Sequence, residues 1–345
     1  MNNINELDTL LSASKCVCVT AHTHPDGDAL GSCLALAGYL RECRRKDVTV
    51  VIPDSVPDSL SFILRDFRGY PVIAYEESPA AATDTIRTSD LICCLDCSSF
   101  ARTNPAMQTV LSASKAPKVL IDHHLNPDKD SFSLVFSETE VSSTCELLYL
   151  ILKEMPDVGG SLVKLPGSVL GALMTGMTTD TNNFANSVFP GTLRMASELI
   201  AAGVDRDRIL SDLYNNYREN RLRLMGYLLS DNMVITPEGA AVMILDKETQ
   251  ERFGFRQGES EGFVNLPLAA ANVKISLFLT EEEGRFRVSV RSKRGFSANK
   301  LAMTCFHGGG HEMAAGGKLY FPEDIPSPAD AKAHILKVTR EFLSR

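Results

Sequence analysis

Residues 15–32 of this chain read KCVCVTAHTHPDGDALGS, and this stretch decides the fold. Its first part is an apolar, β-branched run that is typical of a buried strand, and residues 29–43 carry apolar side chains at helical spacing. Pro25 and Gly27 allow a tight turn between the two. A strand that passes through a polar turn into a helix is typical of a parallel α/β sheet.

The same alternation continues through the first half of the chain. Strands are expected at 15–21, 48–52, 91–95 and 118–121, and helices at 29–43, 144–153 and 166–177, with a capping box of Ser143 and Glu146 before the second helix. Residues 187–231 show helical patterns only, and β-type alternation returns at 240–245, 273–280 and 285–291 before a last helix at 329–343. We therefore expect an α/β protein with an N-terminal parallel-sheet domain at 1–186, a helical connector at 187–231, and a smaller C-terminal mixed α/β domain at 232–345. The substrate cleft is expected between the two domains.

Composition narrows the class of protein. The 345 residues exceed the usual size of a single core, and 44% hydrophobic with 23% charged residues is typical of a globular enzyme. No signal peptide or membrane-crossing run is apparent, and the nine cysteines are scattered through apolar stretches, so we expect a cytoplasmic protein without a membrane partner. The net charge of −8 argues against tight non-specific binding of long duplexes.

Side chains that bind hard cations follow three of the expected strands. Because the carboxyl ends of parallel strands meet at one edge of a sheet, where α/β sheets hold ligands, we expect these side chains to lie close together. An aspartate at the end of the helix at 166–177 belongs to the same set. The candidates are His22, Asp26, Asp28, Asp96, Asp122, His123, His124 and Asp180. Simpler local explanations are a capped turn for the residues at 22–28, a polar turn for 122–124 and a helix-end cap for Asp180.

Five carboxylates at one place cannot all stay ionised without cations, because like charges raise their pKa values. Two divalent ions resolve the conflict, and oxygen and nitrogen donors suit Mn²⁺ or Mg²⁺ better than zinc. Two such ions, bound about 3.5 to 4 Å apart, acidify a water molecule and clamp a phosphoryl group. The set therefore indicates a two-metal phosphoesterase.

A second group of residues lies in the C-terminal part of the chain. Residues 306–311 read FHGGGH, and we expect their glycine amides, followed by a helix start, to approach an anion. The nearby Arg291, Ser292 and Lys293 belong to a local basic concentration, and Arg291 can bind phosphate bidentately. A flexible glycine turn and a solvated basic hairpin are the alternatives.

At this point the chain resembles the DHH phosphoesterase superfamily. The signatures occur in order: His-x-x-Pro-Asp-Gly-Asp-x-Leu-Gly-Ser from His22, the isolated Asp96, the triplet at 122–124, and Thr-Asp-Thr around Asp180. Arg-Ser-Lys at 291–293 and Gly-Gly-Gly-His-x-x-Ala-Ala-Gly at 308–316 are similar to the substrate-binding domain of bacterial nano-RNases. These are oligoribonucleases that also dephosphorylate 3'-phosphoadenosine 5'-phosphate.

The resemblance implies a role for each residue. One metal would be held by His22, Asp26 and Asp96, and the other by Asp28, Asp96, His123 and Asp180, with Asp96 bridging. His124 would face the scissile phosphate and orient or protonate the leaving oxygen, and Asp122 would fix an imidazole tautomer. The terminal phosphate or nucleotide would be received by Arg291, Ser292, Lys293, Gly309, Gly310 and His311. His24 and His307 depart from the family pattern, and their roles stay open.

The residues and the resemblance together predict a metal-dependent hydrolase, with Mn²⁺ expected and Mg²⁺ as the alternative. Its substrates would be short oligoribonucleotides, cut to mononucleotides, and 3'-phosphoadenosine 5'-phosphate, converted to AMP. Short DNA and other phosphorylated nucleotides are further expected partners, and a homodimer is an open alternative. A phosphodiesterase for linear or cyclic dinucleotide messengers is an alternative of the same chemistry. A non-catalytic nucleotide-binding or RNA-binding protein is the alternative from another class.

Overall fold

A computed structural model describes residues 3–344, and the chain forms two compact units, Met1–Asn216 and Tyr217–Arg345. The division falls inside the stretch 187–231, which is helical as expected. The expected domain boundaries at 186 and 231 stay predictions. No helix within residues 3–344 combines the length and the apolar composition that crossing a membrane requires.

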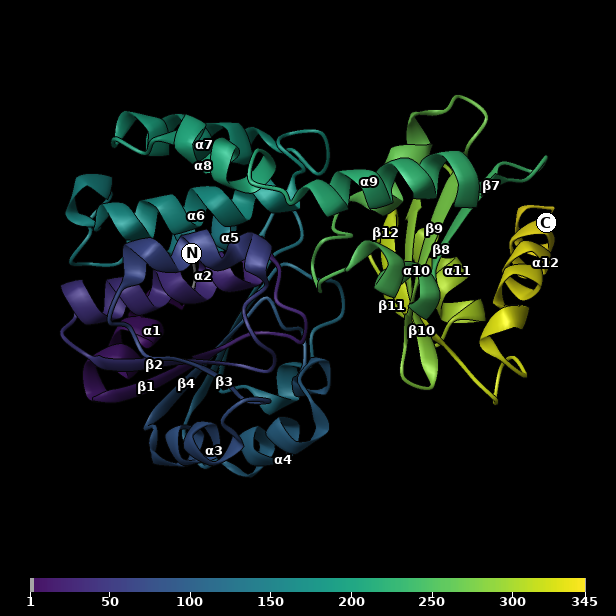
Figure 1. The fold of residues 1–345 in the computed structure, drawn as a ribbon. Helices are drawn as coiled ribbons and strands as arrows, with labels where there is room; N and C mark the ends of the chain where they lie inside the picture. The colour runs from purple at the N-terminus through teal and green to yellow at the C-terminus, as the bar shows by residue number, and fades with distance from the viewer. Residues whose placement is uncertain (1–2, 345) are drawn as a thin grey trace. The chain divides into compact units, whose positions relative to one another are not determined.

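The first unit contains a six-stranded, fully parallel sheet (Figure 1). Its strands are β1 (Cys16–Thr20), β2 (Asp47–Ile52), β3 (Val72–Ala74), β4 (Leu91–Leu95), β5 (Lys118–Asp122) and β6 (Leu134–Ser137). Along β4, Leu91, Cys93 and Leu95 join the core on one face, whereas Ile92 and Cys94 join the core on the other. Burial of both faces explains why these strands are continuous apolar runs in the sequence.

Helices cover both faces of this sheet. The helices are α1 (Ile4–Ala13), α2 (Gly27–Gly38, continued by a π-helical turn at Tyr39–Cys43), α3 (Pro79–Thr88), α4 (Pro105–Ala113), α5 (Thr144–Glu154), α6 (Gly167–Asp180), α7 (Pro190–Ala201) and α8 (Arg206–Tyr214). Figure 1 shows α2, α5 and α6 on one face and α3 and α4 on the other, and α7 and α8 pack outside α6. This confirms the predicted α/β architecture with a parallel sheet.

The strand order of this sheet, β3-β2-β1-β4-β5-β6, places a topological switch point between β1 and β4. The chain moves outward from β1 in one direction and from β4 in the other, so the loops after these two strands separate to opposite faces. Open α/β sheets bind ligands in the crevice that this separation leaves at the carboxyl ends of the strands. The segments after β1, β4 and β5 are those that carry the candidate ligands.

The second unit contains a six-stranded mixed sheet in the order β11-β12-β10-β9-β8-β7, in which only β8 and β9 are parallel. Its strands are β7 (Val234–Ile235), β8 (Ala240–Leu245), β9 (Ile275–Glu282), β10 (Arg285–Ser292), β11 (Gly309–Gly310) and β12 (Ala314–Tyr320). Its helices are α9 (Glu219–Tyr227), α10 (Lys247–Phe253), α11 (Ala298–Cys305) and α12 (Ala331–Leu343). One face packs on α11 and α12, and the other packs on α9 and the 3-10 helix Phe263–Ala269.

Two local expectations were wrong. The glycines at 308–310 are followed by a strand and not by a helix, because Gly309 and Gly310 pair with Gly316 and Ala315 of β12. A Cβ at Gly308 would overlap the carbonyl oxygen of Gly316, so close strand approach accounts for the glycine there. The capping box is also incomplete: Ser143 caps the amide of Glu146 at 3.0 Å, but the Glu146 carboxylate accepts from Ser142.

Candidate metal centre

Three polar segments at the carboxyl ends of β1, β4 and β5 meet the end of α6 in the first unit. Within the described residues, the ligand atoms of His22, Asp26 and Asp96 lie within 4.8 Å of one another, and so do those of Asp28, His123 and Asp180. The structure therefore brings together side chains that the sequence grouped, and their roles as ligands stay predictions.

The first of these groups is built on the loop between β1 and α2. Asp26 caps α2, because its Oδ1 accepts from the amides of Asp28 and Ala29, both at 3.0 Å. Asp26 therefore caps the helix and also belongs to the group with His22 and Asp96, so the two interpretations are compatible. His22 Nδ1 lies 2.7 Å from the carbonyl oxygen of Thr23, and its Nε2 lies 3.2 Å from Asp96 Oδ2. A carbonyl on Nδ1 is the arrangement that orients a metal-binding imidazole through its other nitrogen.

The second group surrounds His123. Its Nε2 lies 3.4 Å from Asp180 Oδ2, 3.6 Å from Asp96 Oδ1 and 4.0 Å from Asp28 Oδ2. Asp96 follows β4 in the left-handed conformation, with φ of 52°, and this turn brings its carboxylate between the two groups. One imidazole nitrogen and three carboxylates thus converge on one point.

The amino end of α5 forms an unexpected part of this site. Asp28 Oδ2 accepts from the amide of Thr144 at 2.7 Å, and Asp28 Oδ1 accepts from the amide of Cys145 at 2.9 Å. The Thr144 hydroxyl also donates to Asp96 Oδ1 at 3.0 Å. Free amides and the positive end of the helix dipole stabilise a carboxylate at this position. The sequence indicated the start of this helix, but no local pattern indicated that it faces Asp28.

His124 lies at the edge of the cluster. Its Nδ1 is 2.8 Å from Asp122 Oδ1 and 3.4 Å from Asp96 Oδ1. Its Nε2 is 3.0 Å from Nη1 of Arg102, a residue that sequence analysis missed. Arg102 ends the 3-10 helix Phe100–Arg102, shortly after Asp96 in the chain.

The buried charges perturb one another. Burial, together with the negative charges of Asp96 and Asp26, raises the pKa of Asp28 well above its usual range. Burial opposes ionisation of Asp96 too, but the hydrogen bond from His22 and the neighbouring imidazoles hold its pKa below its usual range. Burial alone would lower the pKa of His22, but the hydrogen bond to Asp96 raises it to about 9. Burial lowers the pKa of His123.

The donor set fits two divalent cations. The fully buried Asp122 Oδ2 has no hydrogen-bond partner within the described part of the chain, and Asp28 cannot ionise easily without a compensating positive charge. Oxygen and imidazole nitrogen are the ligands that hard or borderline divalent ions take, and none of the candidate ligands is a thiolate.

The predicted substrate residues lie together at one end of the sheet of the second unit. Arg291 and Ser292 end β10, next to the first residue of β12, and Gly309 and Gly310 pair with the same strand. Lys293 is engaged elsewhere, since its ammonium donates to the carbonyl oxygen of Ala270 at 2.7 Å. His311 closes a tight turn to β12, in which its amide donates to the Ala314 carbonyl at 2.8 Å.

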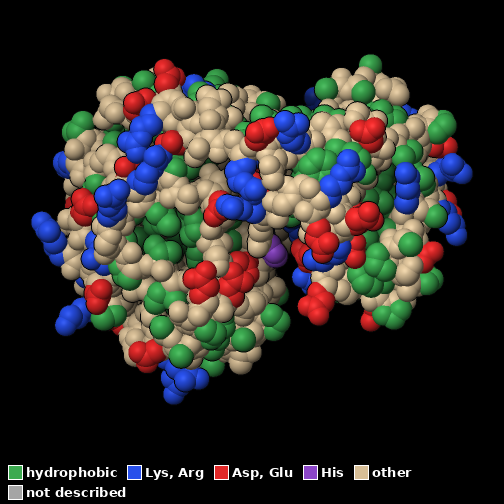
Figure 2. Space-filling model, viewed as in Figure 1, with side chains coloured by type: hydrophobic (Ala, Val, Ile, Leu, Met, Phe, Trp, Pro, Cys, Tyr) green, Lys and Arg blue, Asp and Glu red, His purple; other side chains and the backbone are tan. Residues whose placement is uncertain are grey.

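Two histidines outside the family pattern are exposed. His24 has φ of 54°, and its amide donates to the carboxylate of Asp54. His307 lies in the second unit, where its Nε2 is 3.0 Å from Asp324 Oδ1. On the face drawn in Figure 2, acidic and basic side chains are intermingled, and no continuous basic band is visible.

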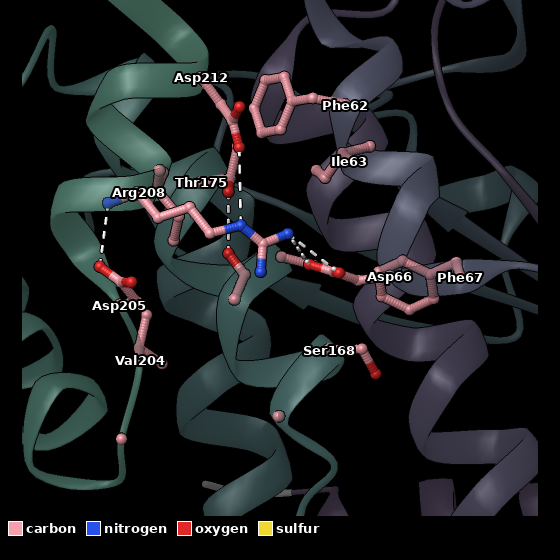
Figure 3. Close-up of a pocket in the computed structure, with 15 residues that line it drawn as sticks. Phe62, Ile63, Asp66, Phe67, Ser168, Thr175, Val204, Asp205, Arg208 and Asp212 are labelled. Carbon is pink, nitrogen blue, oxygen red and sulfur yellow. Dashed lines mark hydrogen bonds and ion pairs between the residues drawn. The ribbon is translucent and has the colours of Figure 1, made fainter.

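A cavity of about 390 Å³ lies elsewhere in the first unit, between α6, α8 and the 3-10 helix Asp58–Phe67 (Figure 3). None of the candidate ligands lines it. Its arginine, Arg208, is paired with Asp66 at 3.1 Å and lies 3.8 Å from Asp212. The converging acids and imidazoles, and not this cavity, are the candidate site.

Comparison with known proteins finds a matching family domain in each unit. The DHH family, N-terminal domain, matches residues 16–177, and the DHHA1 domain matches residues 239–344. The chain is 29% identical over 320 residues to the bifunctional oligoribonuclease and PAP phosphatase NrnA of Bacillus subtilis, covering 91% of this chain and 93% of that protein. It is 29% identical over 330 residues to the protein of the same name in Thermus thermophilus, covering 95% and 90%.

A solved structure extends the likeness to the whole chain. The exopolyphosphatase-related protein of Bacteroides fragilis is 33% identical, with a TM-score of 0.88, and the match covers 99% of this chain and 96% of that one. Identity of this size over nearly all of both chains, together with the two matching domains, shows that this chain belongs to the DHH family.

Proposed function

We propose that this protein is a metal-dependent phosphoesterase that hydrolyses short oligoribonucleotides to mononucleotides and 3'-phosphoadenosine 5'-phosphate to AMP. The observation that carries the proposal is the convergence of two ligand groups, each with an imidazole, at the carboxyl edge of the parallel sheet. The relatives named for oligoribonuclease and PAP phosphatase activity match this chain over both units, which supports the substrate class.

The proposed ligands are those that the geometry groups. His22, Asp26 and Asp96 would hold one ion, and Asp28, Asp96, His123 and Asp180 would hold the other. When bound, the two ions supply an acidified water as the nucleophile and positive charge for the phosphoryl oxygens. Mn²⁺ is the proposed ion, because the set mixes imidazoles with carboxylates and contains no thiolate.

The remaining residues position the substrate and assist the leaving oxygen. Asp122 accepts from Nδ1 of His124 and thereby fixes the orientation of that imidazole. His124 faces the scissile phosphate from the edge of the cluster. In the second unit, Arg291, Ser292, Gly309, Gly310 and His311 receive the terminal phosphate or nucleotide. Lys293 is left out of this set, because its ammonium is bound to the Ala270 carbonyl. Short substrates are favoured by the net charge of −8 and the absence of tryptophan, since a path for long single strands needs basic and stacking side chains.

The test is hydrolysis by purified protein stripped with a chelator and then supplied with Mn²⁺ or Mg²⁺. The substrates are an RNA dinucleotide, a five-residue RNA, 3'-phosphoadenosine 5'-phosphate, and a linear and a cyclic dinucleotide messenger. Turnover of the first three above the messengers supports the proposal. Faster turnover of the messengers would show that they are the substrates, and the proposed phosphoester hydrolysis would still hold.

Asp96→Asn separates an enzyme from a binding protein. Asparagine tolerates the left-handed backbone at this position, so the substitution removes one charge with little effect on the turn. Hydrolysis should fall by at least about a hundredfold, whereas the exposed Asp84→Asn on α3 should be neutral. Unchanged hydrolysis in Asp96→Asn would exclude the proposed centre, and RNA binding without turnover in the native protein would favour the non-catalytic alternative.

The compartment is part of the proposal. All nine cysteines are free, and six of them are buried among apolar residues. Thiols kept in this state suit a reducing compartment, so we propose that the protein acts in the cytoplasm.

A further inference from the structure

Arg102 is a cation at the edge of the candidate metal centre. Its guanidinium is half-buried and lies 3.0 Å from Nε2 of His124. Within residues 3–344 this is the only hydrogen bond of its side chain, and it forms no ion pair there. The imidazole that it contacts is itself grouped with the carboxylates of Asp96 and Asp122.

The contact orients His124 as well as Arg102. Nε2 of His124 faces the guanidinium, a group that can only donate hydrogen bonds. Nδ1 of the same ring lies 2.8 Å from Asp122 Oδ1, so the imidazole is held between a carboxylate and the guanidinium. The guanidinium therefore covers the ring nitrogen that points away from Asp122.

The backbone of Arg102 is held firmly while its side chain is not. Its carbonyl oxygen accepts from the amide of Thr23 at 2.8 Å, and its own amide donates to Ser99 at 3.0 Å. Thr23 belongs to the loop that carries His22 and Asp26, so the base of the arginine moves with that loop. One hydrogen bond to the imidazole of His124 holds the charged end, which leaves the remaining N–H groups for an anion.

We propose that Arg102 binds the phosphoryl group of the substrate and rests on His124 when no substrate is present. A planar guanidinium matches phosphate oxygens in charge and in geometry, whereas the contact with His124 uses only one of its donors. Transfer of the guanidinium to the phosphate would also expose Nε2 of His124 beside the leaving oxygen. The inference rests on the proposed function and adds a phosphate anchor in the first unit.

The test compares Arg102→Gln and Arg102→Lys with Arg87→Gln, a matched control on the exposed surface of α3. AMP binding to the Mn²⁺-supplied protein is measured by calorimetry, and kcat/KM is measured with an RNA dinucleotide. For Arg102→Gln we expect affinity for AMP and kcat/KM to fall by similar factors, about 10- to 100-fold, which is the size of a lost charge-assisted hydrogen bond. Arg102→Lys should recover part of the loss, and Arg87→Gln should stay within about twofold of the native protein.

A double-mutant cycle separates phosphate binding from simple support of His124. If Arg102 acts only by orienting His124, AMP affinity stays unchanged in Arg102→Gln, and the substitution has no further effect on kcat/KM in a His124→Asn background. Either result overturns the proposal. Far-UV circular dichroism and urea unfolding confirm that the variants are folded. A native protein that binds AMP through Arg102 but hydrolyses nothing would refute the proposed function and leave this inference standing.

Discussion

Gly176→Ala tests how closely the helices that carry Asp28 and Asp180 must approach. Gly176 lies in α6 opposite the first turn of α2. A methyl group at this position would lie 2.9 Å from Asp28 Oδ1 and 3.0 Å from Asp28 Cα, and it would overlap the Cys145 sulfur. Unstrained carbon contacts are about 3.5 to 4.0 Å, so the helix axes must separate or the carboxylate must turn.

A second glycine of the same helix supplies the control. A methyl group at Gly171 meets no atom within 4 Å. Alanine is better than glycine in a helix by about 1 kcal/mol at either position, so this gain cancels when the two variants are compared. What remains is the cost of overpacking, about 1 to 3 kcal/mol. In a unit of this size each kcal/mol shifts Tm by about 2 to 4 °C.

The assay is urea and thermal unfolding followed by far-UV circular dichroism, because the chain has no tryptophan. Gly171→Ala should be slightly more stable than the native protein, and Gly176→Ala should be less stable than Gly171→Ala by the overpacking cost. Mn²⁺ should stabilise Gly171→Ala as much as the native protein and Gly176→Ala less, because Asp28 is displaced. Equal stability of the two alanine variants would refute the packing argument.

Three further predictions concern single side chains of the site. With a pKa of about 9, His22 is protonated in the metal-free protein at pH 7. Metal binding should therefore release one more proton from the native protein than from His22→Gln, and this difference should vanish above pH 9. Calorimetry in buffers of different ionisation enthalpy measures the number of protons released. Thr144→Val removes the donor to Asp96 Oδ1 and should lower the free energy of unfolding by about 1 to 3 kcal/mol, with Thr144→Ser restoring it; no change in urea midpoint would contradict the contact. Glu146→Ala leaves the donors of Ser142 and Thr192 without their buried acceptor and should cost at least about 2 kcal/mol, and a smaller loss in the same unfolding assay would mean that water replaces the carboxylate.

The strands that the sequence predicted best are those whose whole length is buried. The runs at 91–95 and 119–121 are apolar on both faces, and each is followed by an acid, so their pattern differs sharply from a loop. By contrast, β3 is a short edge strand with half-buried residues, and β12 contains two glycines that resemble a turn. Their strand character comes from the neighbouring backbone, which no local pattern contains.

The candidate site divides in the same way. Asp96 and His123 were predictable because each follows a strand, and parallel topology brings such positions together. Arg102 and Thr144 lie in a 3-10 turn and at a helix start, where polar residues are ordinary. Their contacts with His124 and Asp96 depend on side-chain directions across the fold, which spacing along the chain does not encode.

The two amides that donate to Asp28 make this centre depend on the position of the α5 backbone. A peptide N–H is present whatever the side chain, so positions 144 and 145 can vary in residue type and still supply the contact to Asp28. An insertion or deletion within the first turn of α5 would instead move those amides relative to Asp28, and no side-chain replacement could restore them. The contact to Asp28 therefore constrains the backbone at 144 and 145, whereas the hydroxyl of Thr144 is constrained separately by its bond to Asp96.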